Sequence, residues 1–369
     1  MIYLAANATD PLRPAARDTA LAAMGLGNPS SIHAAGRAAR RVLEEARESI
    51  ARAFHAKPAD VMFCSGATEA NALAIHSLGA GRPVLLGATE HDAVRAAAPG
   101  AAVIPVLPDG TLDSAALESL LAAHPGALVC LMAANNETGV LHPIAEAAHV
   151  CAAHGAVLHV DAVQAAGRCR ADWLGLGAAS FAISGHKFGA PAGAGALIVS
   201  PGREITPVQR GGGQESNRRG GTPALPAIAG MAAALAEPYD AVSITAYRDE
   251  IEAFCVSLGA IAIGASAPRL PNTTCLALPG LRADTQLIAL DMAGIAVSAG
   301  AACSSGKLGP SHVLAAMGLG ELSGQAIRVS LPWNVTADAI PAFRRAYEAM
   351  IKQRLRAQPR CAKRKPWRK

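Results

Sequence analysis

Apolar and polar positions alternate along the first two thirds of the chain in a way that predicts strands and helices in turn. Short apolar runs, of the kind that form buried strands, occur at 61–64, 84–86, 103–106, 128–133, 157–160, 180–183 and 196–199. Helical spacing of apolar residues predicts helices at 30–54, 69–77, 114–123, 144–154 and 222–236. This order is typical of an α/β domain with a largely parallel sheet.

After about Tyr247 the pattern changes. It predicts a helix at 248–258, followed by strand-like segments at 272–278 and 297–298. We therefore predict two domains: a large domain over 13–246, and a smaller α+β domain formed by 1–12 and 247–369. The smaller domain ends in a basic tail at about 352–369.

Polar residues gather where three of the predicted strands end, at 135–137, 161–164 and 184–187. A fourth strand leads through a glycine turn at 65–69 into a helix, and a helix N-terminus is a ready site for phosphate. In open α/β sheets, ligands bind outside the carboxyl ends of the strands. The four clusters therefore predict one ligand site at one edge of the sheet.

A phosphate cradle, a carboxylate and a lysine at strand ends together suggest pyridoxal phosphate. The Lys187 amine can form a Schiff base with the aldehyde of this cofactor. The Asp161 carboxylate can keep the pyridine nitrogen protonated, which makes the ring an electron sink. Taken singly, an aspartate here is usually a turn residue or helix cap, a lysine is a solvated charge, and His91 is a capping residue. Their occurrence together favours the cofactor site.

The charged residues are distributed unevenly along the chain, and this bears on which partners the protein can have. The chain has 369 residues, of which 51% are hydrophobic and 17% charged, and this excludes a disordered chain. Nine of the 33 basic residues, and no acid, lie at 352–369, so the rest holds 24 basic and 28 acidic residues, a net charge of −4. Because the net positive charge is confined to this tail, the charge of the chain does not favour nucleic acid as a partner of the whole protein. We expect the tail to be a solvated, frayed end, with a docking arm for an acidic partner or RNA as the alternative.

The N-terminus has neither the charged nor the apolar region of a signal peptide, and no uncharged stretch is long enough to span a membrane. The eight cysteines show no Cys-x-x-Cys pair and no metal-ligand spacing, so we predict a cytoplasmic protein without a metal site. Six cysteines lie in or beside apolar runs and are expected to be small buried hydrophobes: Cys64, Cys130, Cys151, Cys169, Cys255 and Cys275. Cys303 differs, because it lies in a loop of small residues that can move.

A series of short motifs runs through nearly the whole chain in one order, at 28–33, 36–37, 65–71, 89–91, 135–139, 159–164, 184–187, 211–215, 221–222, 298–303 and 327–330. On these motifs the chain resembles the cysteine desulfurases of the NifS/IscS-like group, in the aminotransferase class V superfamily. The resemblance implies a fold-type I transferase fold, pyridoxal 5'-phosphate as cofactor and a homodimer. It also implies conversion of L-cysteine to L-alanine, with the sulfur passed as a persulfide on Cys303 to an acceptor protein such as an Fe–S scaffold.

The resemblance further assigns roles to single residues. Lys187 carries the cofactor and moves protons at the substrate Cα, His91 stacks on the ring and assists that transfer, and Cys303 is the nucleophile. Asp161 pairs with the pyridinium nitrogen and Gln164 with the phenolic oxygen. Five residues bind the phosphate, the last of them from a second subunit: Ala67, Thr68, Ser184, His186 and Thr222. The substrate carboxylate is gripped by Asn136, which also belongs to the cofactor site, and by Arg328, whose guanidinium is well suited to it.

The chain departs from the family pattern in three places, one of them after Lys187, where the run 188–193 lacks the usual basic residue after the proline. The opening motif usually reads Tyr-Leu-Asp-Asn-Asn-Ala-Thr-Thr-Pro, and here Ala5 stands in place of the acid. The segment that docks scaffold proteins in the housekeeping members has no clear match, and the basic tail stands there instead. Two other functions stay open: a related class V lyase acting on selenocysteine or cysteine sulfinate, which needs no thiol at Cys303, and a non-catalytic sulfur-relay or assembly partner that keeps the fold.

Overall fold

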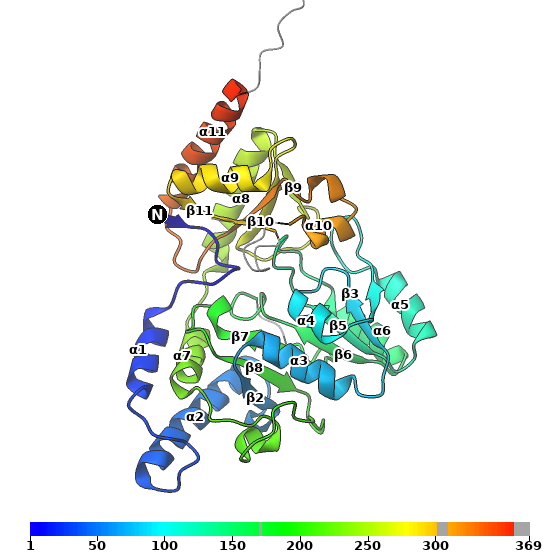
Figure 1. Ribbon diagram of the computed structural model, residues 1–369, viewed down its shortest axis with the longest axis vertical. Helices are drawn as coiled ribbons and strands as arrows, with labels where there is room; N and C mark the ends of the chain where they lie inside the picture. Colours follow the sequence, from blue (N-terminus) through cyan, green and yellow to red (C-terminus); the bar gives the residue numbers. More distant parts are fainter. Residues whose placement is uncertain (170–171, 301–308, 358–369) are drawn as a thin grey trace, which may run out of the picture.

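The computed structural model describes residues 1–169, 172–300 and 309–357 (Figure 1). Cys303 and the end of the basic tail lie outside the described residues. The described chain forms a large α/β domain, and a smaller domain in which the first strand lies beside late segments of the chain (Figure 1).

The large domain is built on a seven-stranded sheet with the order β2-β8-β7-β6-β5-β3-β4. β8 is antiparallel to both of its neighbours, and the other paired strands run parallel. All seven strands were predicted, because their nearly continuous apolar runs are typical of strands buried on both faces. Their bounds are β2 Val61–Cys64, β3 Val84–Gly87, β4 Ala102–Ile104, β5 Leu128–Met132, β6 Val157–Asp161, β7 Ser180–Ser184 and β8 Gly195–Val199.

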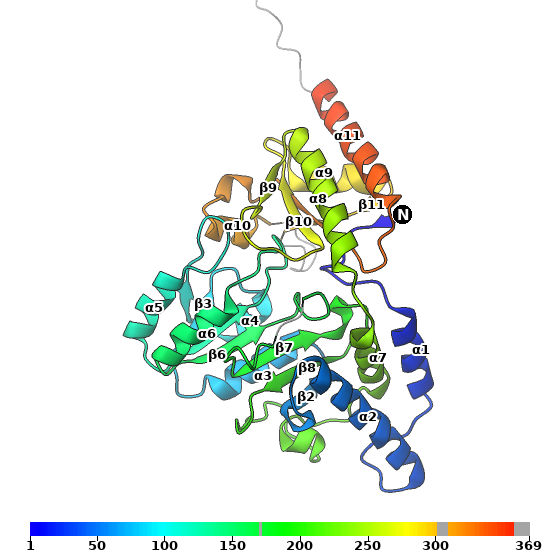
Figure 2. The ribbon, with the colours of Figure 1, turned by 180° about the vertical axis from the view of Figure 1, so that it is seen from behind.

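Helices cover both faces of this sheet (Figures 1 and 2). α3 (Ala67–Leu78) and α4 (Asp92–Ala97) pack on the face that carries Met62, Leu86 and Cys130. The opposite face is covered by α2 Ala34–Ala53, α5 Ser114–Ala123, α6 Ile144–Ala153 and α7 Leu225–Ala236, and α1 Pro14–Ala23 packs on α7. Alternate residues of each strand thus contribute to two separate apolar layers.

The small domain has two sheets. β1 (Ile2–Tyr3) pairs in parallel with β11 (Ile295–Ala296). The second sheet is antiparallel, and its strands in order are β12 Ser298–Ala299, β13 Ala326–Ser330, β10 Thr273–Ala277 and β9 Ile261–Ile263. Helices α8 Ala241–Ser257, α9 Ala283–Met292 and α11 Ala339–Ala357 share one apolar core with Leu276 and Ile327, and α10 His312–Ala316 packs in another.

Four 3₁₀ turns complete the described structure, at Pro58–Asp60, Gly185–Lys187, Gln214–Asn217 and Gly320–Leu322. Several segments differ from the sequence prediction, two of them at predicted boundaries. α8 begins at Ala241 instead of residue 248, so the predicted domain boundary between 246 and 247 falls inside this helix. α11 continues to Ala357, so the predicted tail starts as part of a helix and not as a frayed end. In the described part of the chain, no helix is both long and apolar enough to cross a membrane.

Candidate active site

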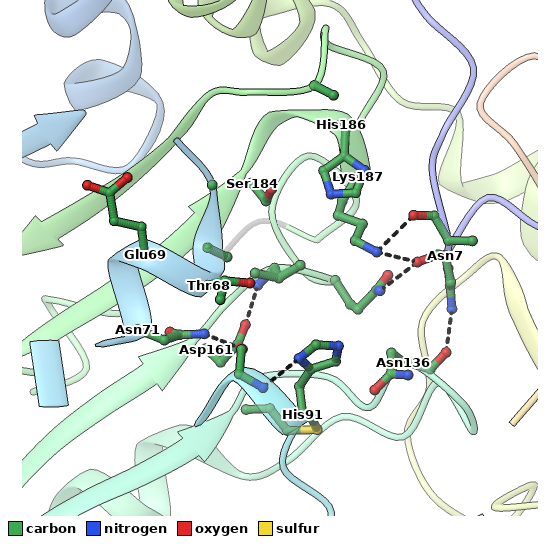
Figure 3. Close-up of a pocket in the computed structure, with 18 of the residues that line it drawn as sticks. Asn7, Thr68, Glu69, Asn71, His91, Asn136, Asp161, Ser184, His186 and Lys187 are labelled. Atoms are coloured by element: carbon green, nitrogen blue, oxygen red, sulfur yellow. Dashed lines mark hydrogen bonds between the residues drawn. The ribbon is translucent and has the colours of Figure 1, made fainter. Parts of the chain in front are cut away.

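A cavity of about 540 Å³ lies at the carboxyl ends of the central strands, where α3 begins (Figure 3). Nine of the residues that the sequence singled out line it together: Ala67, Thr68, His91, Asn136, Asp161, Gln164, Ser184, His186 and Lys187. They come from five segments that are far apart in the sequence. The strand order brings them together, because β5, β6 and β7 are neighbours in the sheet and run in the same direction.

The start of α3 forms one end of the cavity. Gly66 precedes the helix, and no side chain among the described residues caps its first turn, so main-chain N–H groups are available to an anion. The Thr68 and Ser184 hydroxyl-bearing side chains line the same end. A side chain on Gly195 of β8 would come within 2.7 Å of the Gly66 Cα, so this close approach of strand and loop needs a glycine.

An acid close to this helix start is neutralised by an arginine. Glu69 accepts a hydrogen bond from the Ser65 N–H at 2.7 Å and forms an ion pair with Arg219 at 2.7 Å. Burial alone would raise the pKa of Glu69, but the hydrogen bonds from Arg219 and Ser65 outweigh it and lower the pKa. The negative charge of Glu69 is therefore paired, which keeps the helix start suitable for an anion.

Asp161, at the end of β6, accepts the first hydrogen bond of a chain that continues through three uncharged side chains. Asn71 Nδ2 donates to Asp161 Oδ2 at 2.8 Å (Figure 3). Asn71 Oδ1 lies 2.9 Å from His159 Nε2. His159 Nδ1 in turn lies 2.8 Å from Ser180 Oγ. Since the carboxylate fixes the amide orientation of Asn71, His159 must carry its proton on Nε2. Burial lowers the pKa of His159 to about 4, so this imidazole is neutral at pH 7.

The charge on Asp161 is set by opposing effects. Burial is the largest and raises the pKa of the carboxyl. Burial is opposed by the Val163 N–H, which donates to Oδ1 at 3.0 Å, by the Asn71 amide, and by the nearby basic side chains of His91 and Lys187. A cation in the cavity beside Asp161 would add to the forces that favour the carboxylate.

Lys187 and His91 line the same cavity (Figure 3). Lys187 ends the 3₁₀ turn that follows β7, and its Nζ donates to the main-chain oxygens of Asn7 and Ala8, each at 2.9 Å. His91 precedes α4, and its Nδ1 accepts the Ala93 N–H at 3.0 Å. His91 is thus a helix cap and a cavity residue at once, so the two interpretations of this histidine do not exclude each other.

Arg328 comes from the small domain. It lies on β13, is 2% exposed, and donates from Nη1 to the main-chain oxygen of Asn136 at 2.9 Å. Arg328 does not line the cavity itself, whereas Asn136 does. The small domain therefore touches the wall of the cavity at Asn136.

Comparison with known proteins assigns the chain to a family. The family model described as Aminotransferase class-V matches residues 2–343. The chain belongs to this family. It is 37% identical to an IscS-like cysteine desulfurase of Mycobacterium tuberculosis, over 90% of this chain and 91% of that protein, and 38% identical to a cysteine desulfurase of Cereibacter sphaeroides, over 91% and 92%. The crystal structure of a NifS-like protein from Rickettsia africae superposes with a TM-score of 0.89 at 34% identity, over 95% of this chain and 99% of that one. The predicted fold class and family are confirmed.

The opening segment of this class-V chain is held in place without the acid that Ala5 replaces. Ala5 is buried and forms a parallel bridge with Ser330 of β13. Asn7 donates from its main chain to Ser330 Oγ at 3.0 Å and from Nδ2 to Thr273 Oγ1 at 2.9 Å. The segment is therefore tied to two strands of the small domain, and its path past the cavity does not depend on a carboxylate at position 5.

Two residues with expected roles lie apart from the cavity of this class-V chain. Thr222 is exposed, and it lines a hollow of about 70 Å³ that shares Ser65 and Gly193 with the cavity. Cys303 lies outside the described residues. The residues on either side of its segment do lie near the cavity wall, because Ser311 Oγ donates to Glu137 Oε2 at 2.6 Å and Gly300 packs against the same carboxylate.

The six other cysteines named above are poor nucleophiles. All six are free thiols, five are buried and Cys169 is half-buried. Burial raises the pKa of every one of them, to about 12 for Cys151 and Cys275. Because the thiolate is the reactive form, none of these six is suited to attack a substrate.

Sequence reasoning missed several residues of the site. Asn71 and His159 lie in two of the motifs, but the contacts of Asn71 with Asp161 and with His159 depend on the packing of α3 against β6. Asn7 and Arg168 were given no role. A signal for Arg168 existed, since it follows Gln164 by four residues, but its other partners come from the N-terminal segment and from the turn at Lys187.

Proposed function

We propose that the protein is a pyridoxal-phosphate-dependent cysteine desulfurase, which converts L-cysteine to L-alanine and retains the sulfur. The observation that carries this proposal is the meeting of Lys187, Asp161 and the open start of α3 around one cavity. The names of the relatives, cysteine desulfurases at 37–38% identity over nine tenths of the chain, support the same reaction.

The groups that line the cavity fit pyridoxal phosphate. The Lys187 amine would hold the aldehyde, Asp161 the ring nitrogen, and Gln164 the phenolic oxygen. The phosphate would lie at the start of α3 between Thr68, Ser184 and His186. Burial and the charge of Lys187 lower the pKa of His186 to about 4, so this residue would act as a neutral hydrogen-bond partner rather than as a cation. When bound, the cofactor supplies an electron sink for charge that develops at the substrate Cα.

The chain's own residues would then handle protons and orientation. Lys187 Nζ is the amine placed to move a proton at the substrate Cα, and His91 is the second titratable side chain on the cavity wall. Asp161, aligned by Asn71, would hold the positive charge of the ring nitrogen in place. Asn136 and Arg328 would hold the substrate carboxylate, Asn136 at the cavity and Arg328 from behind it.

Cys303 is proposed as the sulfur acceptor within the enzyme. The balanced reaction takes L-cysteine and the Cys303 thiol to L-alanine and a Cys303 persulfide, so it needs no external oxidant. The raised pKa values of six other thiols support this assignment, as do the positions of Gly300 and Ser311 beside Glu137.

We also propose a homodimer in which Thr222, exposed in the single chain, completes the phosphate site of the partner. The persulfide sulfur would pass to an acceptor protein, either an Fe–S scaffold or a component of another sulfur pathway. The six free thiols support a reducing compartment, and we place the protein in the cytoplasm.

The test is the production of alanine and sulfide from L-cysteine by the cofactor-loaded protein in the presence of a reductant. We expect equal molar amounts from the wild type and from the control Cys169→Ser, and a loss of at least about 100-fold in Cys303→Ser. Undiminished turnover in Cys303→Ser would replace the persulfide mechanism by a direct lyase. A wild type that takes up no pyridoxal phosphate would refute the proposal as a whole.

A further inference from the structure

Behind the cavity wall lies a buried arginine that contacts two of its residues. Arg168 follows β6, and its side chain is 0% exposed. Its Nη1 donates to Gln164 Oε1 at 2.6 Å and to Asn7 Oδ1 at 3.1 Å. Its Nη2 donates to the main-chain oxygen of Lys187 at 2.8 Å and to that of Ala6 at 3.3 Å. One guanidinium thus joins the turn after β6, the lysine turn after β7 and the N-terminal segment.

These contacts leave the Gln164 amide only one orientation. An arginine has no acceptor, so the amide atom that faces Arg168 must be the oxygen. The amide nitrogen then faces the Asn7 main-chain oxygen, to which it donates at 3.0 Å. The second hydrogen of that nitrogen remains for the cavity, which Gln164 lines. Arg168 therefore makes Gln164 a hydrogen-bond donor toward whatever occupies the cavity.

A buried guanidinium needs a counter-charge, and Asp10 provides it. Asp10 Oδ2 lies 3.5 Å from Arg168 Nη2, and the Asp10 side chain is 1% exposed. Asp10 Oδ1 accepts the Trp333 N–H at 3.3 Å, which links the pair to the small domain. Removing one partner of such a pair leaves the other charge buried and uncompensated.

We propose that Arg168, with Asp10 as its counter-ion, is a positioning residue for the site: it fixes the donor orientation of Gln164 and the main chain of Lys187. Neither residue lines the cavity, so both act through their neighbours. The inference rests on the proposed function, because it concerns how the chain holds pyridoxal phosphate. It predicts that disturbing the pair changes the cofactor site itself, beyond any loss of stability.

The test uses the cofactor-loaded protein with Arg168→Lys, which keeps the charge but loses the planar fork, and Asp10→Asn, which keeps the shape but loses the charge. A matched control is the buried pair of Arg269 and Glu252 in the small domain, changed to Arg269→Lys and Glu252→Gln. Three quantities are measured for each variant: the dissociation constant of pyridoxal phosphate, the pH midpoint of the absorbance of the bound chromophore, and the melting temperature.

We expect both test variants to bind pyridoxal phosphate about 10-fold more weakly and to raise the pH midpoint by about one unit, since a lost donor disfavours the ionised phenolic oxygen. The control variants should lower the melting temperature and leave the other two quantities unchanged. If Arg168→Lys does not fold, the same three measurements on Asp10→Asn test the proposal.

Test variants that lose only thermal stability, as the controls do, would reduce Arg168 to a structural residue and overturn the inference. That outcome leaves the proposed function intact as long as the wild type binds the cofactor and produces alanine. Failure of the wild type in these assays would instead refute the proposed function.

Discussion

Two buried carboxyl groups near the cavity differ in what surrounds them. Glu90, directly before His91, is 0% exposed, and its Oε1 accepts the Met132 N–H at 2.6 Å. Its Oε2 has no hydrogen-bond partner among the described residues. Burial, and then the charge of Asp161, raise the pKa of Glu90 well above its usual range. The protonated form of Glu90 is therefore favoured. Burial raises the pKa of Asp161 too, but hydrogen bonds and nearby basic side chains partly offset the effect there.

Glu90→Gln should be well tolerated, because glutamine has the shape of a protonated glutamate. We expect a change in the free energy of unfolding within about 1 kcal/mol at pH 7. A raised pKa in the folded state means that the wild type loses stability as pH rises through that pKa, and the variant does not. This loss begins at the unfolded value of 4.5, so the free energy of unfolding in urea should favour the variant more at pH 8 than at pH 5.

Glu252→Gln is the matched comparison. Although burial opposes it, hydrogen bonds from Arg269 and Thr274 lower the pKa of Glu252, so the charged form is the native one. This variant should cost about 2–4 kcal/mol at pH 7, because Arg269 loses its partner. Equal costs for the two substitutions would show that Glu90 is charged in the folded protein.

The Asn71 amide is the contact on which Asp161 depends most directly. Asn71→Asp would place a second carboxyl group 2.8 Å from Asp161, and two like charges at that distance cannot both ionise. We expect at least a 10-fold loss of affinity for pyridoxal phosphate, measured by absorbance titration. Ser180→Ala, which removes the far end of the same hydrogen-bonded chain, should leave the affinity within about 3-fold of the wild type. A reversed order of the two effects would contradict this account of Asp161.

At the scale of elements, the sequence predicted the sheet better than the helices. Every strand of the large sheet was predicted, because each is a short and mostly apolar run. α4 has six residues and is too short to show a helical period, and α9 has the polar Gln286 buried at a core-facing position. α11 was not predicted, although Ile340, Phe343, Tyr347 and Met350 follow helical spacing and are buried.

The turn after β6 is the element whose geometry the site depends on. Gly167 has a φ of +75°, and a Cβ there would lie 2.6 Å from the Phe188 Cβ, next to Lys187. Gly155 has a φ of +62°, and a Cβ there would have no neighbour within 4 Å, so Gly155→Ala measures the cost of backbone strain alone. We expect Gly155→Ala to cost about 1 kcal/mol and Gly167→Ala about 3 kcal/mol in urea unfolding. Equal costs would mean that Phe188 moves aside freely.

At the scale of the whole molecule, the sequence predicted which strand ends meet, and eight of the nine cavity residues lie in the clusters at those ends. The ninth, His91, was assigned only through the family resemblance. It could not predict the support behind them. Arg168 and Lys187 each donate to a main-chain oxygen of a residue about 160 to 180 positions away. Every residue has such an oxygen, so a sequence does not indicate which one accepts. The contact of Asn136 with Arg328 likewise depends on how the two domains meet.

Buried neutral histidines make the whole fold sensitive to acid. Burial lowers the pKa of both His142 and His159 to about 4, from an ordinary value of 6.5. A lowered pKa means that the unfolded chain takes up protons first, so stability is complete above pH 6.5 and falls between 6.5 and 4. Each histidine should contribute a loss of up to about 3 kcal/mol over that range.

Unfolding free energies at pH 7.5 and pH 5 test this expectation. His142→Leu should flatten the pH dependence, whereas the exposed His76→Gln should leave it unchanged. An unaltered slope in His142→Leu would assign the acid sensitivity to the carboxyl groups instead.

The pairing of β1 with β11 has a consequence for synthesis on the ribosome. Ile2 pairs with Ile295, and Ala5 pairs with Ser330. The first strand therefore has no partner strand until nearly the whole chain has emerged from the ribosome. Domains generally fold as units from the N-terminus during translation, so the large sheet can form before this strand docks. Until then the segment around Asn7, whose main-chain oxygen accepts from Lys187, is not anchored. The reactive amine is thus enclosed only when the last third of the protein has been made, which couples completion of the site to completion of the polypeptide.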